Sequence, residues 1–263
     1  MPTLEARGVE IAWRERGEGQ PVLLVHETAA GASVWDAVVE SLAERARAIS
    51  YDRRGWGASS APEDYRRTTV EEQSEDAAVL LESADAVPAV VAGAGVGAMV
   101  ALDLLLRRPE LVAGTVLIEP PVLQLLPSAT EALSQDRRRL EIAAGSGEDV
   151  IGLYLSGALP ALGAEVSRLP AELTAPARER PRRVIAEMGI SPGWRAPLPR
   201  LAAVERPSAI VTAASTPPLL RDAAAALSAR LARSSGYEVE SGPAAPHVGA
   251  PDQVAAVALE LTP

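Results

Sequence analysis

The sequence predicts an α/β protein built on a doubly wound, mostly parallel sheet. Three observations support this prediction. Apolar runs of strand length alternate with segments of helical periodicity along most of the chain, an order that places helices on both faces of a parallel sheet. The run at residues 21–25 is apolar throughout, as in a strand buried on both faces. Residues 88–101 have the pattern of a strand, a glycine turn and a helix.

The individual elements follow from local signals. Residues 1–20 predict a hairpin because Gly8, Gly17 and Gly19 mark its turns. A helix is expected from Thr69, because a threonine followed by acids is a typical helix N-cap. Further strands are expected at 48–51, 90–91, 114–118, 207–212 and 237–239. Further helices are expected around 36–42, 99–106, 219–231 and 254–257.

The texture changes between residues 121 and 199. Strand signals vanish there, proline and glycine are frequent, and helical patterns occur at 128–143, 148–156 and 176–188. This stretch predicts a helical cap, 121–199, inserted into an α/β core made of residues 1–120 and 200–263.

Composition excludes several classes of function. The 263 residues contain no cysteine, which excludes disulfides, a thiolate nucleophile and thiolate zinc sites. Only His26 and His247 are present, so a site with several histidine ligands is excluded, and we expect neither a metal nor a cofactor. The net charge of −10 argues against nucleic-acid binding.

The expected partner is a small-molecule substrate or ligand. No apolar run approaches the roughly 18–20 residues of a membrane span, and the first residues lack the features of a signal peptide. We therefore expect no membrane association and a cytoplasmic location. The sequence leaves the oligomeric state open.

The most informative stretch is Gly93-Ala94-Gly95-Val96-Gly97. It has the spacing of a nucleophile elbow, G-x-S-x-G, in which the central side chain stands on a sharp turn above the sheet. Here the central residue is Gly95, which has no side chain that could attack. A positive φ at this position costs other residues on the order of 1 kcal/mol or more, whereas glycine adopts it freely. The turn is therefore predicted to be present and its nucleophile absent.

Four motifs occur in an order that resembles the α/β-hydrolase superfamily, over nearly the whole chain. They are His26-Glu27-Thr28 after the first buried strand, Asp52-x-Arg54-Gly55-x-Gly57-x-Ser59, the glycine turn at 93–97, and Pro246-His247 before the last helix. The resemblance implies the α/β-hydrolase fold with a cap in the predicted place. It also implies an esterase-like activity.

The resemblance assigns roles to particular residues. His247 would be the general base, with a side chain suited to exchange protons near neutral pH. Glu119 follows the strand at 114–118 and would be the acid that orients His247, because the later loop 213–218 contains no carboxylate. The backbone N–H groups of Thr28 and Val96 would form the oxyanion hole.

Two departures from the family pattern matter. Gly95 stands where the family has Ser, Asp or Cys, and Glu27 stands where it usually has Gly. A carboxylate beside the hole would oppose a developing oxyanion, so we expect Glu27 to point to solvent or else to take part in proton transfer. His26 is expected to support its loop by hydrogen bonding, and Asp52 and Arg54 to form a structural ion pair.

The residues leave three hypotheses open. In the first hypothesis the chain is a serine hydrolase altered from Ser to Gly at position 95. In the second it is a natural member of the superfamily without the serine. The latter would use His247, with Glu27 or Glu119, for proton transfer or water activation, or would only bind a ligand. The third is a dinucleotide-binding oxidoreductase, because Gly93-x-Gly95-x-x-Ala98 fits a relaxed G-x-G-x-x-G/A fingerprint and Glu119 follows about 20 residues later.

The expected substrate is a small, largely apolar, ester-like molecule held under the cap. Apolar and aromatic side chains usually line such pockets. The candidates here are Trp35, Tyr154, Met188 and Trp194.

Overall fold

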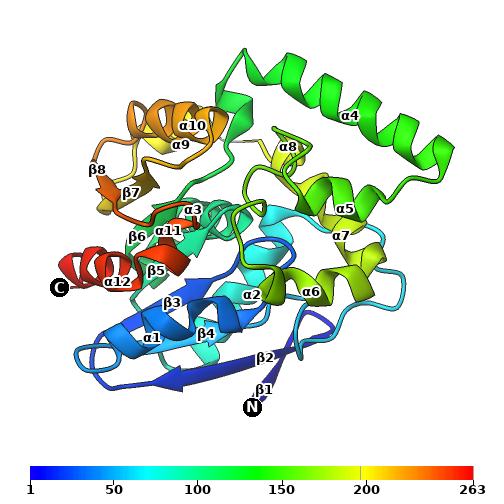
Figure 1. Ribbon diagram of the computed structural model, residues 1–263. Helices are drawn as coiled ribbons and strands as arrows, with labels where there is room; N and C mark the ends of the chain where they lie inside the picture. The colour runs from blue at the N-terminus through cyan, green and yellow to red at the C-terminus, as the bar shows by residue number, and fades with distance from the viewer. Residues whose placement is uncertain (196, 263) are drawn as a thin grey trace.

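Parallel strands form the centre of the molecule. Over residues 1–195 and 197–262, which are those that the computed structural model describes, the chain forms an eight-stranded sheet in the order β1-β2-β4-β3-β5-β6-β7-β8 (Figure 1). The strands are β1 (Thr3–Ala6), β2 (Val9–Arg16), β3 (Pro21–Val25), β4 (Arg47–Tyr51), β5 (Ala89–Ala94), β6 (Val112–Ile118), β7 (Ser208–Ala213) and β8 (Ser234–Val239). The strands β1 and β2 pair in antiparallel fashion, and β2 also runs antiparallel to β4. The pairs from β4 to β8 are parallel, which confirms the predicted fold class.

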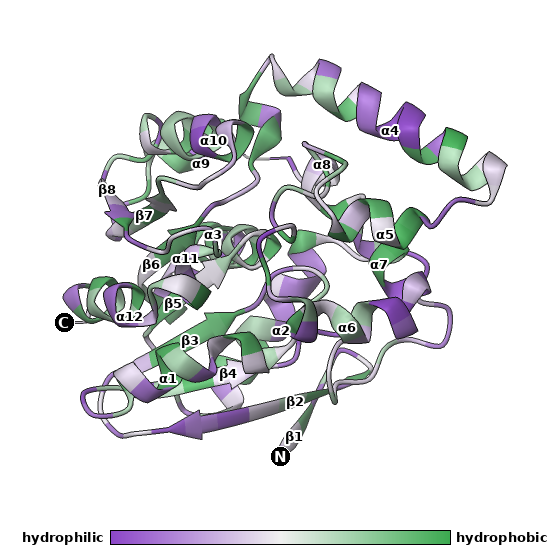
Figure 2. Cartoon of the chain, in the orientation of Figure 1, coloured by the Kyte–Doolittle hydropathy of each residue, from purple (hydrophilic) through white to green (hydrophobic). Residues whose placement is uncertain are grey.

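Helices cover both faces of this sheet. On the core they are α1 (Asp36–Leu42), α2 (Val70–Ser83), α3 (Val96–Arg107), α10 (Pro218–Ser228), α11 (Pro246–Gly249) and α12 (Pro251–Glu260). Alternate residues of β3 enter opposite cores. Leu23 and Val25 pack in the cluster that contains α2 and α3, whereas Val22 and Leu24 pack in the cluster that contains α1 and α12. This two-residue alternation explains why the whole strand is apolar and green in Figure 2.

Between β6 and β7 the described residues form only helices and loops. The helices are α4 (Ala129–Ser146), α5 (Val150–Leu155), α6 (Ala171–Glu179), α7 (Pro181–Glu187), α8 (Ile190–Gly193) and α9 (Leu198–Ala202). Most of them stand over one end of the sheet, with α4 outermost in the view of Figure 1. The ribbon of α4 is rich in purple, hydrophilic residues (Figure 2), and few of its side chains are buried. We call the segment that carries α4 to α8 the cap.

The segment 176–188, which the sequence predicts to be helical, is divided at residue 180. The structure has two helices there, α6 and α7, which meet at Arg180 and Pro181. A proline disfavours helical backbone in the residue before it, and Arg180 has φ −125° and ψ 52°. Pro181 then begins α7 at a position where its missing N–H costs no hydrogen bond.

Two buried ion pairs attach the cap to the core. Both terminal nitrogens of Arg53 lie 3.0 Å from the carboxylate oxygens of Glu187 in α7, and both side chains are almost fully buried. The cap residue Arg168 pairs with Glu119, which directly follows β6. Removing one member of such a pair would leave an uncompensated buried charge, so these contacts favour a closed cap.

None of the helices in the described part of the chain has the length and apolar character that crossing a membrane requires.

Candidate active site

The glycine turn between β5 and α3 has the sharp geometry expected from the sequence. Gly95 has φ 53° and ψ −124°, a conformation that other residues adopt only under strain. A Cβ on Gly97 would overlap the carbonyl oxygen of Val25, so the absence of a side chain lets the start of α3 lie against β3. The turn therefore presents the backbone of residues 95 and 96 to the space beneath the cap.

His247 and Glu27 meet beside this turn. His247 is in the short helix α11, and its Nε2 lies 3.1 Å from Glu27 Oε1. Both side chains are about 98% buried or more. Trp35 packs against the imidazole, with 4.7 Å between ring centroids. The expectation that Glu27 points to solvent is wrong, because its carboxylate turns inward to the imidazole.

Glu119 lies in a different set of contacts. One carboxylate oxygen accepts a 2.5 Å hydrogen bond from the Thr216 hydroxyl, and the other binds the Arg168 guanidinium. The structure does not bring Glu119 to His247. Neither ring nitrogen of His247 makes a hydrogen bond among the described residues, so the 3.1 Å approach of Nε2 to Glu27 is an electrostatic contact. Glu119 therefore anchors the cap, and the contact with a carboxylate at His247 is made by Glu27.

His26 supports the loop that carries Glu27. Its Nδ1 lies 2.7 Å from the Glu27 carbonyl oxygen, and the backbone N–H of Arg53 donates to its Nε2 at 2.9 Å. The Arg53 bond fixes Nε2 as the acceptor, so Nδ1 carries the proton. Burial and the nearby Arg53 charge hold the pKa of His26 well below its usual value. This neutral ring is a structural element, as expected.

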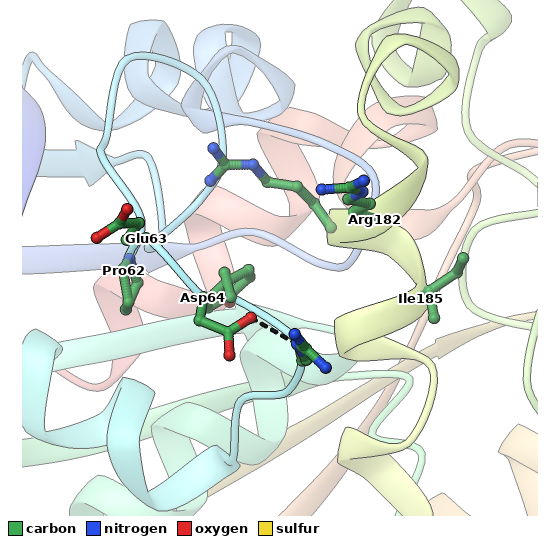
Figure 3. A pocket seen from close by; sticks show the side chains of 8 residues that line it. Pro62, Glu63, Asp64, Arg182 and Ile185 are labelled. Carbon is green, nitrogen blue, oxygen red and sulfur yellow. Dashed lines mark hydrogen bonds and ion pairs between the residues drawn. The ribbon is translucent and has the colours of Figure 1, made fainter.

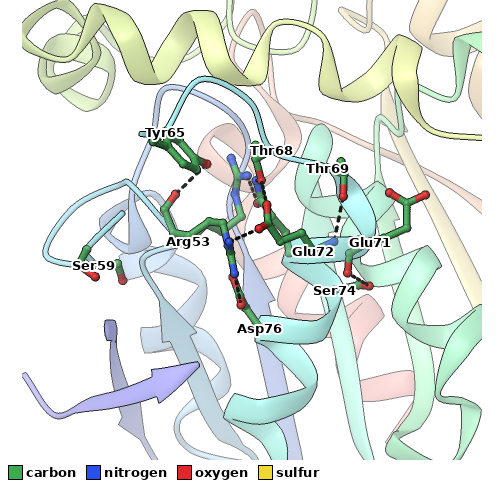
Figure 4. Close-up of polar contacts among 12 residues, drawn as sticks. Arg53, Ser59, Tyr65, Thr68, Thr69, Glu71, Glu72, Ser74 and Asp76 are labelled. Atoms are coloured by element: carbon green, nitrogen blue, oxygen red, sulfur yellow. Dashed lines mark hydrogen bonds and ion pairs between the residues drawn. The ribbon is translucent and has the colours of Figure 1, made fainter. Parts of the chain in front are cut away.

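The predicted ion pair between Asp52 and Arg54 is not formed. Asp52 accepts backbone N–H groups from Ala32 at 2.7 Å and Ala58 at 2.9 Å. Arg54 instead makes a two-pronged pair with Asp76 of α2, at 2.5 and 2.6 Å. Figure 4 shows Asp76 among the polar side chains of this region. Both side chains are structural, but their partners differ from the expected ones, because a carboxylate on α2 matches the fork of the guanidinium.

The sequence gives no indication of Glu165, which the structure places at the centre of the site. This cap residue accepts a 2.6 Å hydrogen bond from the Val96 backbone N–H through Oε2. Its Oε1 accepts a 3.2 Å bond from the Tyr154 hydroxyl. Burial and the nearby Glu27 charge raise the pKa of Glu165 to about 7, although the Val96 N–H opposes the shift. The N–H expected to form the oxyanion hole is therefore occupied.

The other predicted site residues lie in different places. Tyr154 and Met188 line a hollow of about 10 Å³, together with Val96 and Glu165, which is enough for about one water molecule. Trp194 instead donates its indole N–H to Asp103 of α3, at 2.8 Å. Trp35 contacts His247, and Thr28 is fully buried directly after Glu27. The oxyanion role of the Thr28 backbone remains a prediction.

A larger groove of about 650 Å³ lies at the surface between α7 and the loop at 62–66 (Figure 3). Charged side chains line much of it, among them Glu63, Asp64 and Arg182. None of the residues placed at the glycine turn contributes to it.

In the described part of the chain, no group of three acidic or histidine side chains has a metal-binding arrangement.

Residues 22–257 match the model of the alpha/beta hydrolase family. The chain belongs to this family. The dinucleotide hypothesis loses its support, because the glycine turn sits after four earlier strands and beneath the Glu165 carboxyl, where a pyrophosphate would have to bind.

Individual relatives give further comparisons. A hydrolase of Bacillus subtilis (strain 168), YraK, described as uncharacterized, is 38% identical over 124 residues, which are 47% of this chain and 46% of YraK. The match thus spans about half of that relative. The structure of a thermophilic esterase from Thermogutta terrifontis superposes with a TM-score of 0.72 and 23% identity, covering 98% of this chain and 95% of the esterase. The structure of Est816, described as an N-acyl homoserine lactone degrading enzyme, superposes with a TM-score of 0.68 and 19% identity. The superposition covers 98% of this chain and 99% of Est816.

The first prediction concerns the fit between Gly95 and Glu165. A Cβ on Gly95 would overlap Glu165 Oε2, so Gly95→Ser is expected to destabilise the protein through overlap and through its positive φ. In a Glu165→Ala background the overlap with the carboxyl is gone, and the φ cost and the close approach to Glu27 Cβ remain. The two substitutions should therefore couple by about 1 kcal/mol or more in urea unfolding. Additive effects would mean that the Glu165 side chain does not lie over the turn.

The second prediction concerns pH. The Glu165 carboxyl has a pKa of about 7 in the folded protein and a pKa near 4.3 in the unfolded chain. Between these two pH values the carboxyl takes up a proton when the chain folds. Its contribution to the free energy of unfolding is therefore complete below about pH 4.3 and declines as pH rises towards 7. Glu165→Gln, which does not titrate, should gain in melting temperature relative to the wild type between pH 5 and pH 8. The exposed Glu172→Gln serves as the control, and a constant difference for Glu165→Gln would contradict the buried carboxyl.

Proposed function

We propose that this chain hydrolyses small, largely apolar esters with an activated water molecule in place of a serine nucleophile. One observation carries the proposal. The buried carboxylate of Glu27 faces His247 Nε2 at 3.1 Å beside Gly95. In a serine hydrolase the corresponding nitrogen faces the serine hydroxyl. Here a carboxylate and an imidazole form a proton-accepting pair next to a position that has no nucleophile.

In the proposed reaction the pair removes a proton from water, and the hydroxide adds to the ester carbonyl carbon. The negative charge of Glu27 stabilises the imidazolium that forms at His247. The tetrahedral intermediate then breaks its bond to the alkoxy oxygen. This oxygen takes up one proton from the site, equal in number to the proton that the pair removed from water, and a carboxylic acid and an alcohol leave. Trp35 holds the imidazole from one side, so the ring keeps its orientation through the proton transfers.

The structure also favours the hypothesis of a member without the serine over that of an altered serine hydrolase. The space that a serine side chain would need at position 95 is filled by the Glu165 carboxyl. Restoring a serine would require this cap residue to move. The esterase activity of the structural neighbour from Thermogutta terrifontis and the lactone-degrading activity of Est816 support an ester-like substrate class.

Substrate binding requires motion of the cap. The hollow of about 10 Å³ is smaller than any ester, so the cap must move outward to admit one. Its apolar residues, Met188 and Ile190 among them, would then contact the substrate and favour apolar acyl groups.

The third prediction tests this function with p-nitrophenyl butyrate. The wild type should hydrolyse it, and Glu27→Gln or His247→Gln should lower kcat/KM by about 100-fold or more, the usual contribution of a general base. Glu172→Gln in the exposed part of the cap is the matched control. Absence of turnover by the folded wild type, or full activity of Glu27→Gln, would contradict the proposal.

A serine-directed fluorophosphonate provides the complementary measurement. It should leave the wild type unlabelled, because no nucleophile stands at position 95. The double variant Gly95→Ser/Glu165→Ala should become labelled and hydrolyse short-chain aryl esters, since the second substitution makes room for the serine. Stoichiometric labelling of the wild type would show that another residue acts as a covalent nucleophile.

A further inference from the structure

Two carboxyl groups approach Gly95 from different parts of the chain. Glu27 comes from the loop after β3, and Glu165 comes from the cap segment between α5 and α6. A Cβ on Gly95 would lie 3.0 Å from Glu27 Cβ and 3.1 Å from Glu165 Cβ. Because residue 95 is a glycine, both acids reach the same small volume. The hydrolytic mechanism gives a role to Glu27 and none to Glu165.

Their surroundings differ in charge. Glu27 faces the imidazole of His247, which can become positive. Glu165 faces a backbone N–H and a tyrosine hydroxyl, and no arginine or histidine forms an ion pair with it among the described residues. Burial disfavours the charged form of a carboxyl. Together with the nearby Glu27 charge it raises the pKa of Glu165 to about 7, against the opposing effects of the Val96 N–H and the Arg53 charge.

Two carboxyls in unlike surroundings divide naturally into a base and an acid. A neutral Glu165 has one proton to give. One of its oxygens accepts the Val96 N–H at 2.6 Å, and the other lies 3.2 Å from the Tyr154 hydroxyl. Glu165 and Tyr154 both line the hollow beneath the cap. The Val96 and Tyr154 contacts therefore orient the carboxyl beside the hollow, into which an ester can enter only when the cap moves outward.

We propose that Glu165 is the proton donor of the site and protonates the leaving oxygen of the ester. The inference rests on the hydrolytic function proposed above. Water gives a proton to the Glu27–His247 pair and its hydroxide bonds to the carbonyl carbon. When the bond from that carbon to the alkoxy oxygen breaks, the oxygen takes the Glu165 proton and leaves as the alcohol. The proton held by the pair then returns to Glu165, so the enzyme is restored and one water is consumed.

The Glu165→Gln variant distinguishes a proton donor from a structural side chain. Glu165→Gln keeps a carbonyl oxygen for the Val96 N–H and nearly the same volume, but has no acidic O–H. A structural carboxyl would be replaced by the amide with little effect on any substrate. A proton donor matters only when the leaving group needs a proton, because an alkoxide is a far poorer leaving group than a nitrophenolate.

The fourth prediction compares two leaving groups on one acyl chain, ethyl butyrate and p-nitrophenyl butyrate. Glu165→Gln should lower kcat for the ethyl ester by about 100-fold or more and for the p-nitrophenyl ester by less than about 10-fold. In the wild type, kcat for the ethyl ester should fall as pH rises above about 7, because the donor is then ionised, and this limb should be absent from Glu165→Gln. Glu172→Gln should match the wild type throughout.

The outcomes distinguish the two proposals. Equal losses on both esters, or no loss on either, would overturn the role of Glu165 while the activity of Glu27 and His247 stands. A wild-type ethyl-ester profile without the limb near pH 7 would overturn it without relying on any variant. Failure of the wild type to hydrolyse either ester would overturn the proposed function, and this inference with it.

Discussion

The missing side chain at position 95 is the constraint on which the site depends. The turn between β5 and α3 holds its central residue at φ 53°, and the two flanking segments bring Glu27 and Glu165 against it. Any Cβ there would overlap the Glu165 carboxyl. Glycine therefore serves two purposes at once, because it relieves the backbone strain of the turn and opens the space in which two acids and an imidazole assemble.

Burial of these acids is costly and requires compensation from several parts of the molecule. Glu27 faces His247, and Glu165 receives a backbone N–H. The cap is kept over the site by further buried charges, Arg53 with Glu187 and Arg168 with Glu119. Breaking either ion pair leaves a buried charge alone.

Local patterns made much of the fold and part of the site predictable. The alternation of strands and helices, the N-cap at Thr69 and the glycine turn depend on neighbours in sequence, and the structure contains all three. The break between α6 and α7 also had a local signal in Pro181.

Contacts between distant segments were not predictable in the same way. Arg54 has Asp52 two residues away, yet it pairs with Asp76 on α2, since geometry and not proximity in sequence decides a bidentate contact. Glu165 lies in a cap stretch without a motif, and nothing in its neighbours indicates that it reaches Val96. The sequence also left open which carboxylate meets His247, because Glu27 and Glu119 both follow buried strands.

The most direct test asks which carboxylate His247 faces. The chain has two histidines, so the ¹⁵N resonances of their rings can be assigned without ambiguity in histidine-labelled protein. Glu27→Gln should shift the ring nitrogens of His247 strongly, whereas Glu119→Gln should leave them in place. Unchanged His247 resonances in Glu27→Gln, together with a shift in Glu119→Gln, would contradict this arrangement. Glu119 would then be the carboxylate that contacts His247, as the family resemblance implies.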